Sequence, residues 1–370
     1  MASSTGSTPT LGVEEEFLLV DPSTGAPVAL NRAVAERAAR GGVELQLELT
    51  SCQVETTSSV VEDTSDLRDE LLRLRTVAAG AAEAAGAQLL AVGLPPTLPS
   101  QFPVTDTPRY RDIGDRFGMI AHEQGICGCH VHVAVPDRDA AIGVSNRLRP
   151  WLPLLLALTA NSAIYRNADT GHASWRSVLW ARWPSAGPPP QFASADEYDA
   201  AVEMLCHSGV IRDDGMVYWD VRPSRNFPTI EVRVADVPAT VAESVTFAAL
   251  VRGCVMTALE EHRRSEPVQP LAAFALKAAY WKAARDGLVG DSLDLQEHAP
   301  APTRQLLEQL VERVRPALEQ VGDYELVSSG LAGVAERGNG AMRQQAAWRR
   351  GHQVADVLAE AAAATLESPS

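Results

Sequence analysis

The sequence predicts an α+β fold built around an antiparallel β-sheet. In the first two thirds of the chain, short segments alternate between apolar and polar residues, which is typical of strands with one buried face. Two of these segments, residues 216–222 and 229–235, are expected to form a hairpin. From Ala239 to the C-terminus the chain is predicted to be one helix after another, apart from a loop at residues 287–302.

Length and composition limit the class of protein. The chain has 370 residues, of which 46% are apolar, and this is ample for a sizeable core. Its formal net charge of -15 argues against nucleic acid or an anionic membrane as a partner, because both are bound chiefly by clustered lysine and arginine. The most apolar run, residues 151–160, is too short to span a bilayer. We therefore predict a soluble globular protein.

The N-terminal tail and the cysteines indicate a compartment. Residues 1–10 form a polar tail, predicted to be disordered, without the basic and apolar regions of a signal peptide. The five cysteines lack the spacing of a disulfide framework, which suits a reducing cytoplasm. We expect Cys52, Cys127 and Cys129 to be small core residues. Residues 11–365 are predicted to form a single cytoplasmic domain.

Three consecutive carboxylates, Glu14, Glu15 and Glu16, lie in a segment that otherwise has the pattern of a strand. Side chains alternate between the faces of a strand, so Glu14 and Glu16 share one face and Glu15 lies on the other. Like charges this close raise each other's pKa unless a metal ion or an arginine compensates them. On the apolar face, Glu15 requires a buried partner such as an arginine.

Two more glutamates, Glu48 and Glu55, lie in and just beyond the next predicted strand, residues 43–49. Glu55 follows Glu48 by seven residues, an odd spacing that would place the two on opposite faces of one continuous strand. A bend near residues 50–53 is therefore needed if both are to meet one ion.

Two later strands also have a polar face. In residues 126–136, alternation places His130 and His132 on the same face, and in residues 229–235 it places Glu231 with Arg233. Each strand taken alone fits a sheet whose polar face meets water. Together they are better explained by a functional site, because carboxylate, imidazole and guanidinium are the groups that hold metal ions and phosphate.

These motifs resemble the glutamate–cysteine ligase type 2 family, the YbdK-type carboxylate-amine ligases. The resemblance covers residues 11–362 and rests on the segments around Glu14 and Glu16, Glu48 and Glu55, His130 and His132, and Glu231 and Arg233, together with residues 166–169 and 180–184. It implies a fold similar to the catalytic domain of glutamine synthetase. That fold is a curved antiparallel sheet with the active site on its concave face and helices packed on the other side.

The resemblance also implies roles for single residues. The two expected magnesium ions have separate ligand sets: Glu16, Glu48 and Glu55 for one, and Glu14, His130 and Glu231 for the other. His132 would contact substrate, and Arg233 would neutralise the transferred phosphoryl group. Each ion would keep open positions for water and phosphate oxygens, as magnesium prefers.

The implied activity uses ATP and Mg²⁺ to join two amino acids, one supplying a carboxylate and the other an amine. ATP would convert the carboxylate to an acyl phosphate, and the amine would displace phosphate to form an amide. With glutamate and cysteine, the product is γ-glutamylcysteine. Metal ions and arginine suit this chemistry because phosphoryl transfer needs mainly positioning and charge neutralisation. The resemblance further suggests a homodimer.

Arginines in the polar loops are candidates for binding ATP or substrate. Four are expected there: Arg166, Arg182, Arg222 and Arg225. Arg176 is a fifth candidate, and we expect about two of the five to contact a ligand, because exposed arginine is mostly a solvated charge. The tryptophans at positions 175, 180 and 183 could stack on adenine, although aromatic residues at such density usually fill a core.

Alternatives to this function are open. A ligase with the same mechanism that joins other amino acids would carry the same motifs, with its specificity set by loops such as residues 97–116 and 169–192. A non-ATP metal-dependent hydrolase could be built on His130 and His132, because His-x-His on a strand also occurs at zinc sites. The excess of carboxylates over imidazoles disfavours zinc. The full set of six expected ligands disfavours a non-catalytic binding protein.

Overall fold

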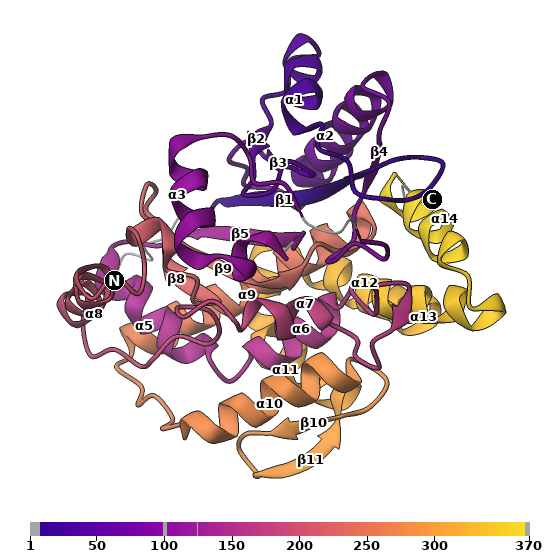
Figure 1. Ribbon diagram of the computed structural model, residues 1–370. Helices are drawn as coiled ribbons and strands as arrows, with labels where there is room; N and C mark the ends of the chain where they lie inside the picture. Colours follow the sequence, from indigo (N-terminus) through magenta and orange to yellow (C-terminus); the bar gives the residue numbers. More distant parts are fainter. Residues whose placement is uncertain (1–7, 99–101, 124, 367–370) are drawn as a thin grey trace.

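The computed structural model describes residues 8–98, 102–123 and 125–366. Figure 1 shows strands of the N-terminal two thirds at the centre, with the C-terminal helices packed below and to one side. Residues 1–7 of the predicted tail, and residues 99–101 of a predicted specificity loop, lie outside the described residues.

Seven strands form one sheet in the order β2-β3-β1-β5-β9-β8, with β4 paired to β1 beside this path. All of its strand pairs are antiparallel. The strands are β1 (Leu11–Val20), β2 (Gln46–Leu47), β3 (Gln53–Thr57), β4 (Gln88–Leu90), β5 (Gly128–Ala134), β8 (Val221–Pro223) and β9 (Thr229–Asp236). Two small antiparallel sheets pair β6 (Ile164–Tyr165) with β7 (Ala168–Asp169) and β10 (Asp291–Asp294) with β11 (Ala299–Pro302).

Helices before β9 connect the strands, and α2, α5 and α6 contribute to the main core. They are α1 (Asn31–Arg40), α2 (Thr64–Ala84), α3 (Pro108–Phe117), α4 (Met119–His122), α5 (Arg138–Leu148), α6 (Leu152–Thr159), α7 (Trp175–Trp180) and α8 (Ala195–His207), with the 3-10 turn η1 (Asp214–Met216). The C-terminal helices are α9 (Val241–Arg263), α10 (Ala273–Asp286), α11 (Thr303–Val321), α12 (Tyr324–Arg337), α13 (Gly340–Gly351) and α14 (Val354–Thr365). This combination of helices with an antiparallel sheet confirms the predicted fold class.

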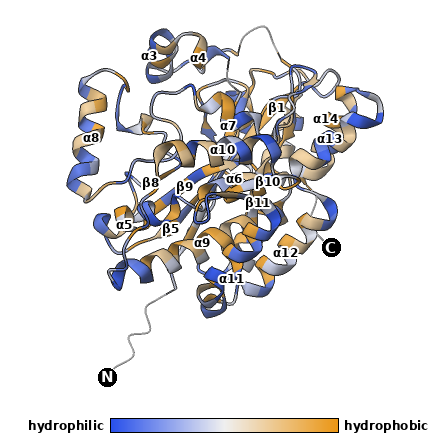
Figure 2. Ribbon diagram, turned by 90° about the horizontal axis from the view of Figure 1, so that it is seen from below, coloured by the Kyte–Doolittle hydropathy of each residue, from blue (hydrophilic) through white to orange (hydrophobic). Residues whose placement is uncertain are grey.

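The main hydrophobic core lies between the apolar face of the sheet and the C-terminal helices. Val13 of β1, Val131 of β5 and Val232 of β9 are fully buried there against α9 and its neighbours. Helix α9 begins where the Thr240 side chain accepts a hydrogen bond from the amide of Glu243, an N-terminal cap. It is largely orange in Figure 2, and it is long and apolar enough to cross a membrane. However, 78% of its most apolar 18-residue stretch is buried inside the protein. Such burial is typical of a core helix.

A second cluster lies on the other side of the polar face of the sheet. It joins α3, α4, α5 and α8 around the buried aromatic side chains of Trp183, Phe192, Tyr198 and Trp219. The aromatic rings of Phe192, Tyr198 and Trp219 contact one another at centroid separations of 5.2 to 5.3 Å. This cluster forms a wall beside the polar face.

Three sequence predictions of local structure are wrong in part: two predicted strands are shorter in the structure, and one predicted loop contains strands. Of the predicted strand at residues 43–49 only β2 pairs, because it lies at the edge of the sheet and meets β3 alone. Of the predicted strand at residues 216–222 only its end is paired with β9: the carbonyl of Asp220 accepts from the amide of Arg233, but its own amide donates to the carbonyl of Gly187, 2.8 Å away. The predicted loop at residues 287–302 contains the hairpin of β10 and β11.

Candidate active site

The strand register places the predicted polar residues beside one another. Glu16 of β1 lies opposite Glu55 of β3, and on the other side of β1, Glu14 lies opposite His130 of β5. The register between β5 and β9 then pairs His132 with Glu231. Four neighbouring strands therefore bring carboxylates and imidazoles to one face, as the alternation predicts.

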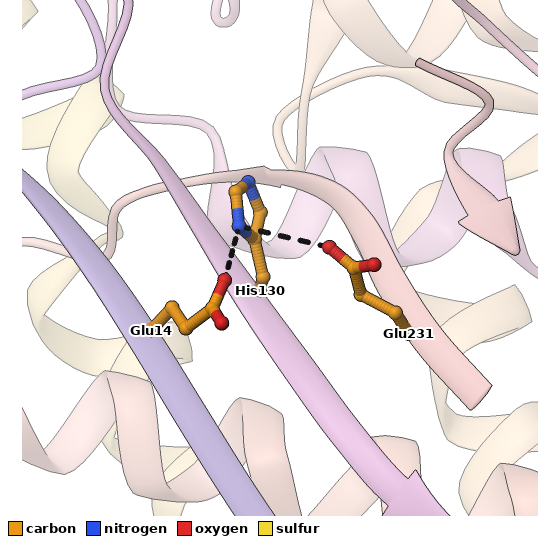
Figure 3. Close-up of side chains that lie close together, drawn as sticks. All are labelled: Glu14, His130 and Glu231. Atoms are coloured by element: carbon orange, nitrogen blue, oxygen red, sulfur yellow. Dashed lines mark hydrogen bonds and ion pairs between the residues drawn. The ribbon is translucent and has the colours of Figure 1, made fainter. Parts of the chain in front are cut away.

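Glu14, His130 and Glu231 form the first compact group on this face (Figure 3). One ligand atom from each residue lies within 4.8 Å of those of the others. The His130 Nδ1 atom is 3.0 Å from Glu14 Oε2 and 3.9 Å from Glu231 Oε1. These three residues are one of the two expected magnesium ligand sets, and three different strands supply them.

Glu16, Glu55 and His130 form a second group within the same 4.8 Å limit. The His130 Nε2 atom lies 3.9 Å from Glu16 Oε1, so His130 stands between the two groups. Glu48 is not a member of this group, although it lines the same cavity. The chain turns at residues 50–53 between β2 and β3, which confirms the bend required to bring Glu48 to the same face as Glu55.

A β-bulge re-aims Arg233 within β9. Cys129 pairs with Ala235 and Val131 with Val232, so β9 has one more residue than β5 across this interval. The Arg233 guanidinium donates to Glu231 Oε1, and its Nη1 atom lies 3.4 Å from His130 Nδ1. The cationic guanidinium of Arg233 is therefore fixed directly beside the group of Glu14, His130 and Glu231.

The carboxyl groups of the site fall into two electrostatic classes. Burial raises the pKa of Glu14, but hydrogen bonds with His130 and His132 outweigh it and hold the pKa below its ordinary value. The pKa of Glu231 is likewise raised by burial, yet the charges of Arg233 and Arg222 bring it well below the ordinary value. Both groups are stabilised as carboxylates by cationic or hydrogen-bonding partners on the chain.

Glu48 and Glu55 belong to the opposite class. Burial and the charge of Glu16 raise the pKa of Glu48 to about 8. Burial and the charge of Glu48 raise the pKa of Glu55 well above its ordinary value. Neither carboxyl forms an ion pair with a basic residue in the described part of the chain. A bound cation would supply the charge that is missing here.

His130 is suited to act as a neutral ligand. It is buried, and burial together with the charge of Arg233 lowers the pKa of its imidazole. The neutral ring is the form that coordinates metal ions. His132 is held through Nδ1, 3.1 Å from Thr229 Oγ1, while its Nε2 atom lies 3.4 Å from Glu14 Oε1.

These residues line a cavity of about 570 Å³, a volume typical of small-ligand sites. The six expected metal ligands, His132 and Arg233 all contribute to its lining. The far wall is aromatic and includes Tyr110, Trp180, Trp183 and Tyr218. Trp180 and Trp183 both pack in hydrophobic clusters and border this cavity. The cavity thus has a charged floor and an apolar, aromatic side.

The structure separates the four arginines that the sequence places at a ligand. Arg222 and Arg225 line the cavity, and Arg222 Nε donates to Glu231 Oε2 over 2.8 Å. Arg166 and Arg182 do not line it; both are paired with Glu123, with nitrogen-to-oxygen distances of 3.5 and 2.9 Å. The fifth candidate, Arg176, lines the cavity and is buried.

Two donors in α7 have no hydrogen-bond partner among the described residues, although the Arg176 Nη1 atom lies 3.7 Å from Asp236 Oδ1. Arg176 Nε and Trp180 Nε1 are buried and make no hydrogen bond with any residue in the described ranges. They lie four positions apart, on the same side of the helix, and both residues line the cavity. Gly128 makes room for this arginine, because a Cβ atom at Gly128 would lie 2.4 Å from Arg176 Nη2. Unpaired buried donors of this kind are ready to meet a ligand oxygen.

Sequence reasoning missed several cavity residues, among them Arg109 and Arg138. Arg109 comes from the predicted specificity loop at residues 97–116, where its Nη2 atom lies 2.7 Å from Asp213 Oδ1. Arg138 pairs with Asp199 across α5 and α8. The structure places Arg109 in the first turn of α3, so the predicted loop is wrong at this position, and its charge was the available signal. Nothing in the local pattern marks Arg138, which begins a helix that is otherwise part of the core.

The expectations for the apolar face are confirmed. Glu15 is fully buried, and Arg75 of α2 meets it with two hydrogen bonds, Nη2 to Oε1 at 2.6 Å and Nε to Oε2 at 3.0 Å. Ser244 of α9 also donates to Glu15 Oε1. Cys52, Cys127 and Cys129 are buried, free thiols in the core.

The comparison with known proteins now decides the family. A sequence model of glutamate–cysteine ligase family 2 matches residues 10–361. The chain belongs to this family. A relative from Mycolicibacterium vanbaalenii, named as a candidate glutamate–cysteine ligase 2-2, is 79% identical over 359 residues, which cover 97% of this chain and 98% of the relative. A relative from Nocardia farcinica, named as a candidate glutamate–cysteine ligase 2-1, is 60% identical, with 97% and 94% covered.

Solved structures share the fold at low identity. A glutamate–cysteine ligase from Francisella tularensis, in complex with AMP, has a TM-score of 0.68 at 13% identity, covering 97% of this chain and 89% of its own. A bifunctional glutathione synthetase from Pasteurella multocida has a TM-score of 0.66 at 15% identity, covering 96% and 52%. At these identities the likeness shows the fold alone. The family membership, rather than the shared fold, identifies the protein as a ligase that forms an amide bond.

Proposed function

We propose that this family 2 protein is an ATP- and Mg²⁺-dependent carboxylate-amine ligase that joins L-glutamate to L-cysteine. The products would be γ-glutamylcysteine, ADP and phosphate. The observation that carries this proposal is the group of Glu14, His130 and Glu231 beside Arg233, in the lining of a cavity of about 570 Å³. The AMP bound to the Francisella tularensis ligase supports nucleotide binding in this fold.

The donor chemistry of the cavity fits magnesium. Carboxylate oxygens predominate, as this ion prefers, and Glu48 and Glu55 lack a cationic partner among the described residues. We propose that Glu14, His130 and Glu231 hold one ion and that Glu16, Glu48 and Glu55 hold the other. When bound, the ions would neutralise the phosphate charges and align the oxygens that react.

Arg233 is proposed to stabilise the phosphoryl group during its transfer. It is buried, and its contact with Glu231 holds the guanidinium beside the first carboxylate group. Arg222 contacts the same carboxylate from the neighbouring strand, with Nε 2.8 Å from Oε2. Two fixed cations would therefore meet the negative charge that develops on the phosphoryl oxygens, and in a buried site they would need no reorganisation.

The reaction would proceed in two balanced steps. An oxygen of the glutamate side-chain carboxylate attacks the terminal phosphorus of ATP, and the bond from that phosphorus to the ADP oxygen breaks, which gives an acyl phosphate and ADP. The amine nitrogen of cysteine then attacks the acyl carbon, and the bond to the phosphate oxygen breaks. A carboxylate or imidazole of the cavity accepts the amine proton. His132, held by Thr229, is proposed to position the substrate.

Arg176 and Trp180 are proposed to bind the remaining carboxylate of a substrate amino acid. Their unpartnered donors, Arg176 Nε and Trp180 Nε1, lie in one wall of the cavity. A carboxylate with two oxygens can accept from both an arginine and an indole donor. Arg225, which also lines the cavity, is exposed and is the arginine better placed for a mobile phosphate group.

The test is turnover by the purified protein with Mg²⁺ and ATP against a full panel of amino-acid pairs, with ADP release and product mass as readouts. We expect ADP release only when glutamate and cysteine are both present, with γ-glutamylcysteine as product. Glu14→Gln is expected to abolish turnover. The matched change Glu312→Gln, at an exposed position on α11, should leave it unchanged.

Each outcome of this panel bears on the proposal. Release of ADP with a different pair would replace the substrates and keep the mechanism. No ADP with any pair in the panel, from protein that unfolds cooperatively, would contradict a ligase. Wild-type turnover by Glu14→Gln would contradict the metal assignment.

A further inference from the structure

A second cavity of about 530 Å³ is separate from the candidate active site, although its lining residue Ala173 lies only three positions before Arg176 of the first cavity. It is bordered by the C-terminal end of α10, the C-terminal end of α12 and α13 from its first turn to its last. It shares no lining residue with the first cavity. In Figures 1 and 2, α13 lies on one side of the molecule, and α3 and α8, which border the first cavity, lie on the other.

Arginine dominates the charged lining of this second cavity. Four guanidinium groups come from three separate helices: Arg285 from α10, Arg337 from α12, and Arg343 and Arg349 from α13. Two carboxylates line it, Asp286 and Glu336, so the lining carries a formal excess of positive charge. This excess stands out in a chain whose formal net charge is -15.

The protein itself leaves much of this positive charge uncompensated. Arg337 and Arg349 make no hydrogen bond or ion pair with any residue that the structure describes. The nearby Asp286 is already occupied, because its Oδ2 atom lies 2.6 Å from Lys282 Nζ and its Oδ1 atom lies 3.8 Å from Arg285 Nη1. Both arginines are exposed, so their donors face solvent and are available to a ligand.

Arg343 is held in place and still has a free donor. Its Nη1 atom lies 2.7 Å from Glu243 Oε1 and 2.6 Å from the carbonyl of Gly338. Its Nη2 atom is buried and has no hydrogen-bond partner within the described ranges. An anchored guanidinium with one unused buried donor is a pre-organised contact for an anion oxygen.

The rest of the lining is apolar or small. It includes Leu288, Ala341, Met342 and Val289, and the Val289 side chain is exposed. The volume lies in the range of small-molecule sites, which combine apolar walls with a few directed polar groups. This combination suits an organic anion better than a bare inorganic ion.

We propose that this second cavity binds a small organic anion that carries at least two carboxylate or phosphate groups. Arginine forms paired hydrogen bonds with both kinds of group. Two or more anionic groups would use guanidinium donors from three helices more fully than one group would. The proposal does not depend on the ligase activity, because none of these arginines lines the first cavity.

The test is isothermal titration calorimetry of the full chain at constant ionic strength, with citrate as the polycarboxylate probe and inorganic pyrophosphate as the phosphate probe. Metal-free buffer is prepared with a chelating resin, because soluble chelators are themselves polycarboxylates. We expect one molecule of at least one probe to bind per chain. The double variant Arg337→Ala/Arg349→Ala should weaken that binding by at least about tenfold, since hydrogen bonds to charged groups are lost.

Two controls test whether the measured binding is due to the overall charge of the protein or to the active site rather than to the second cavity. Arg40→Ala/Arg350→Ala removes two arginines that are exposed and line neither cavity, and it should change binding by less than about twofold. Arg233→Ala, in the first cavity, should also leave binding unchanged. Circular dichroism and thermal unfolding verify that each variant is folded.

The two probes also identify the ligand class. Binding of citrate alone indicates a polycarboxylate, binding of pyrophosphate alone indicates a ligand with phosphate groups, and either supports the site. The proposal is overturned if the wild-type protein binds neither probe. It is equally overturned if Arg337→Ala/Arg349→Ala binds as tightly as wild type, or if Arg233→Ala abolishes the binding.

Discussion

The two faces of strand β1 place neighbouring carboxylates in opposite situations. Glu15 faces the helices, where Arg75 and Ser244 satisfy its two oxygens in a fully buried network. Glu14 and Glu16 face the cavity, where further glutamates and His130 gather around them. A single strand therefore carries one carboxylate whose partners are built into the protein and two that share a crowded acidic site.

This difference distinguishes a carboxylate that stabilises the fold, Glu15, from carboxylates that serve the site, Glu48 and Glu55. Arg75 also donates to the carbonyls of Pro238, Ala239 and Thr365, so the Glu15 pair ties β1 and α2 to the start of α9 and the end of α14. On the cavity face, Glu48 and Glu55 have no such partner among the described residues. Charge that the protein leaves uncompensated marks a site for something the protein binds.

The largest effect is expected from breaking the structural pair. Arg75→Ala leaves the buried Glu15 carboxylate unpaired and should lower the free energy of unfolding by about 3–5 kcal/mol, measured by urea denaturation. Arg73→Ala, on the same helix, removes an exposed arginine that pairs with Glu70 over 2.9 Å. This control should change stability by no more than about 0.5 kcal/mol. Equal losses in the two variants would show that the Glu15 pair is not special.

The second prediction is that a change on the cavity face lowers activity and does not lower stability. Glu55→Gln removes a carboxylate that its acidic neighbours disfavour, so the free energy of unfolding should stay level or rise in metal-free buffer. Turnover should fall by at least about 100-fold, because even residues that only orient metal ligands change activity by 10–100-fold. Urea denaturation and steady-state kinetics measure the two effects. A variant that loses stability and keeps its activity would place Glu55 with Glu15 as a structural residue.

The third prediction concerns pH and magnesium. The pKa of Glu48 is raised to about 8 in the folded protein by burial and Glu16, so between its ordinary value of 4.5 and about 8 the folded state holds a proton that the unfolded state releases. This contribution to stability is complete below pH 4.5 and is lost as the pH rises through 8.

Unfolding followed at a series of pH values tests this sign. Without divalent cations, the free energy of unfolding should fall from pH 5 to pH 8.5, and Mg²⁺ should reduce that fall by binding the deprotonated carboxylates. The variant Glu48→Gln should show a shallower fall in metal-free buffer. A profile that is the same with and without Mg²⁺ would argue against a magnesium site at these residues.

The smallest effects distinguish the predicted arginines. Arg222→Ala removes a contact that orients Glu231 and should lower kcat/KM by about 10–100-fold. Arg182→Ala removes an exposed pair with Glu123 outside the cavity and should change kcat/KM by less than about threefold. Both are measured with saturating ATP and varied amino acid. A larger loss in Arg182→Ala than in Arg222→Ala would mean that the loop carrying Arg182 moves into the cavity during turnover.

Strand periodicity predicted much of the site. The alternation of Glu14, Glu15 and Glu16, the need for an arginine opposite Glu15 and the bend between Glu48 and Glu55 all follow from the two-residue repeat of a strand and the cost of buried charge. These are local rules, so the sequence contains enough information to apply them.

Placement of the loop residues could not be predicted in the same way. Arg166 and Arg182 lie in a segment with the same polar character as Arg176, yet only Arg176 lines the cavity. Their position depends on Glu123, more than 40 residues earlier in the chain, which holds both of them at the surface. Long-range pairs of this kind leave no local periodicity to detect.

The measurement that tests the central contrast most directly is Mn²⁺ binding followed by electron paramagnetic resonance, in the presence of a non-hydrolysable ATP analogue. Two bound ions per chain are expected in the wild-type protein, one for each group of ligands on the cavity face of β1. Glu231→Gln and Glu55→Gln should each reduce this number, whereas Glu312→Gln should not. The absence of bound Mn²⁺ in the wild-type protein, or undiminished binding in both cavity variants, would contradict a metal site on this face.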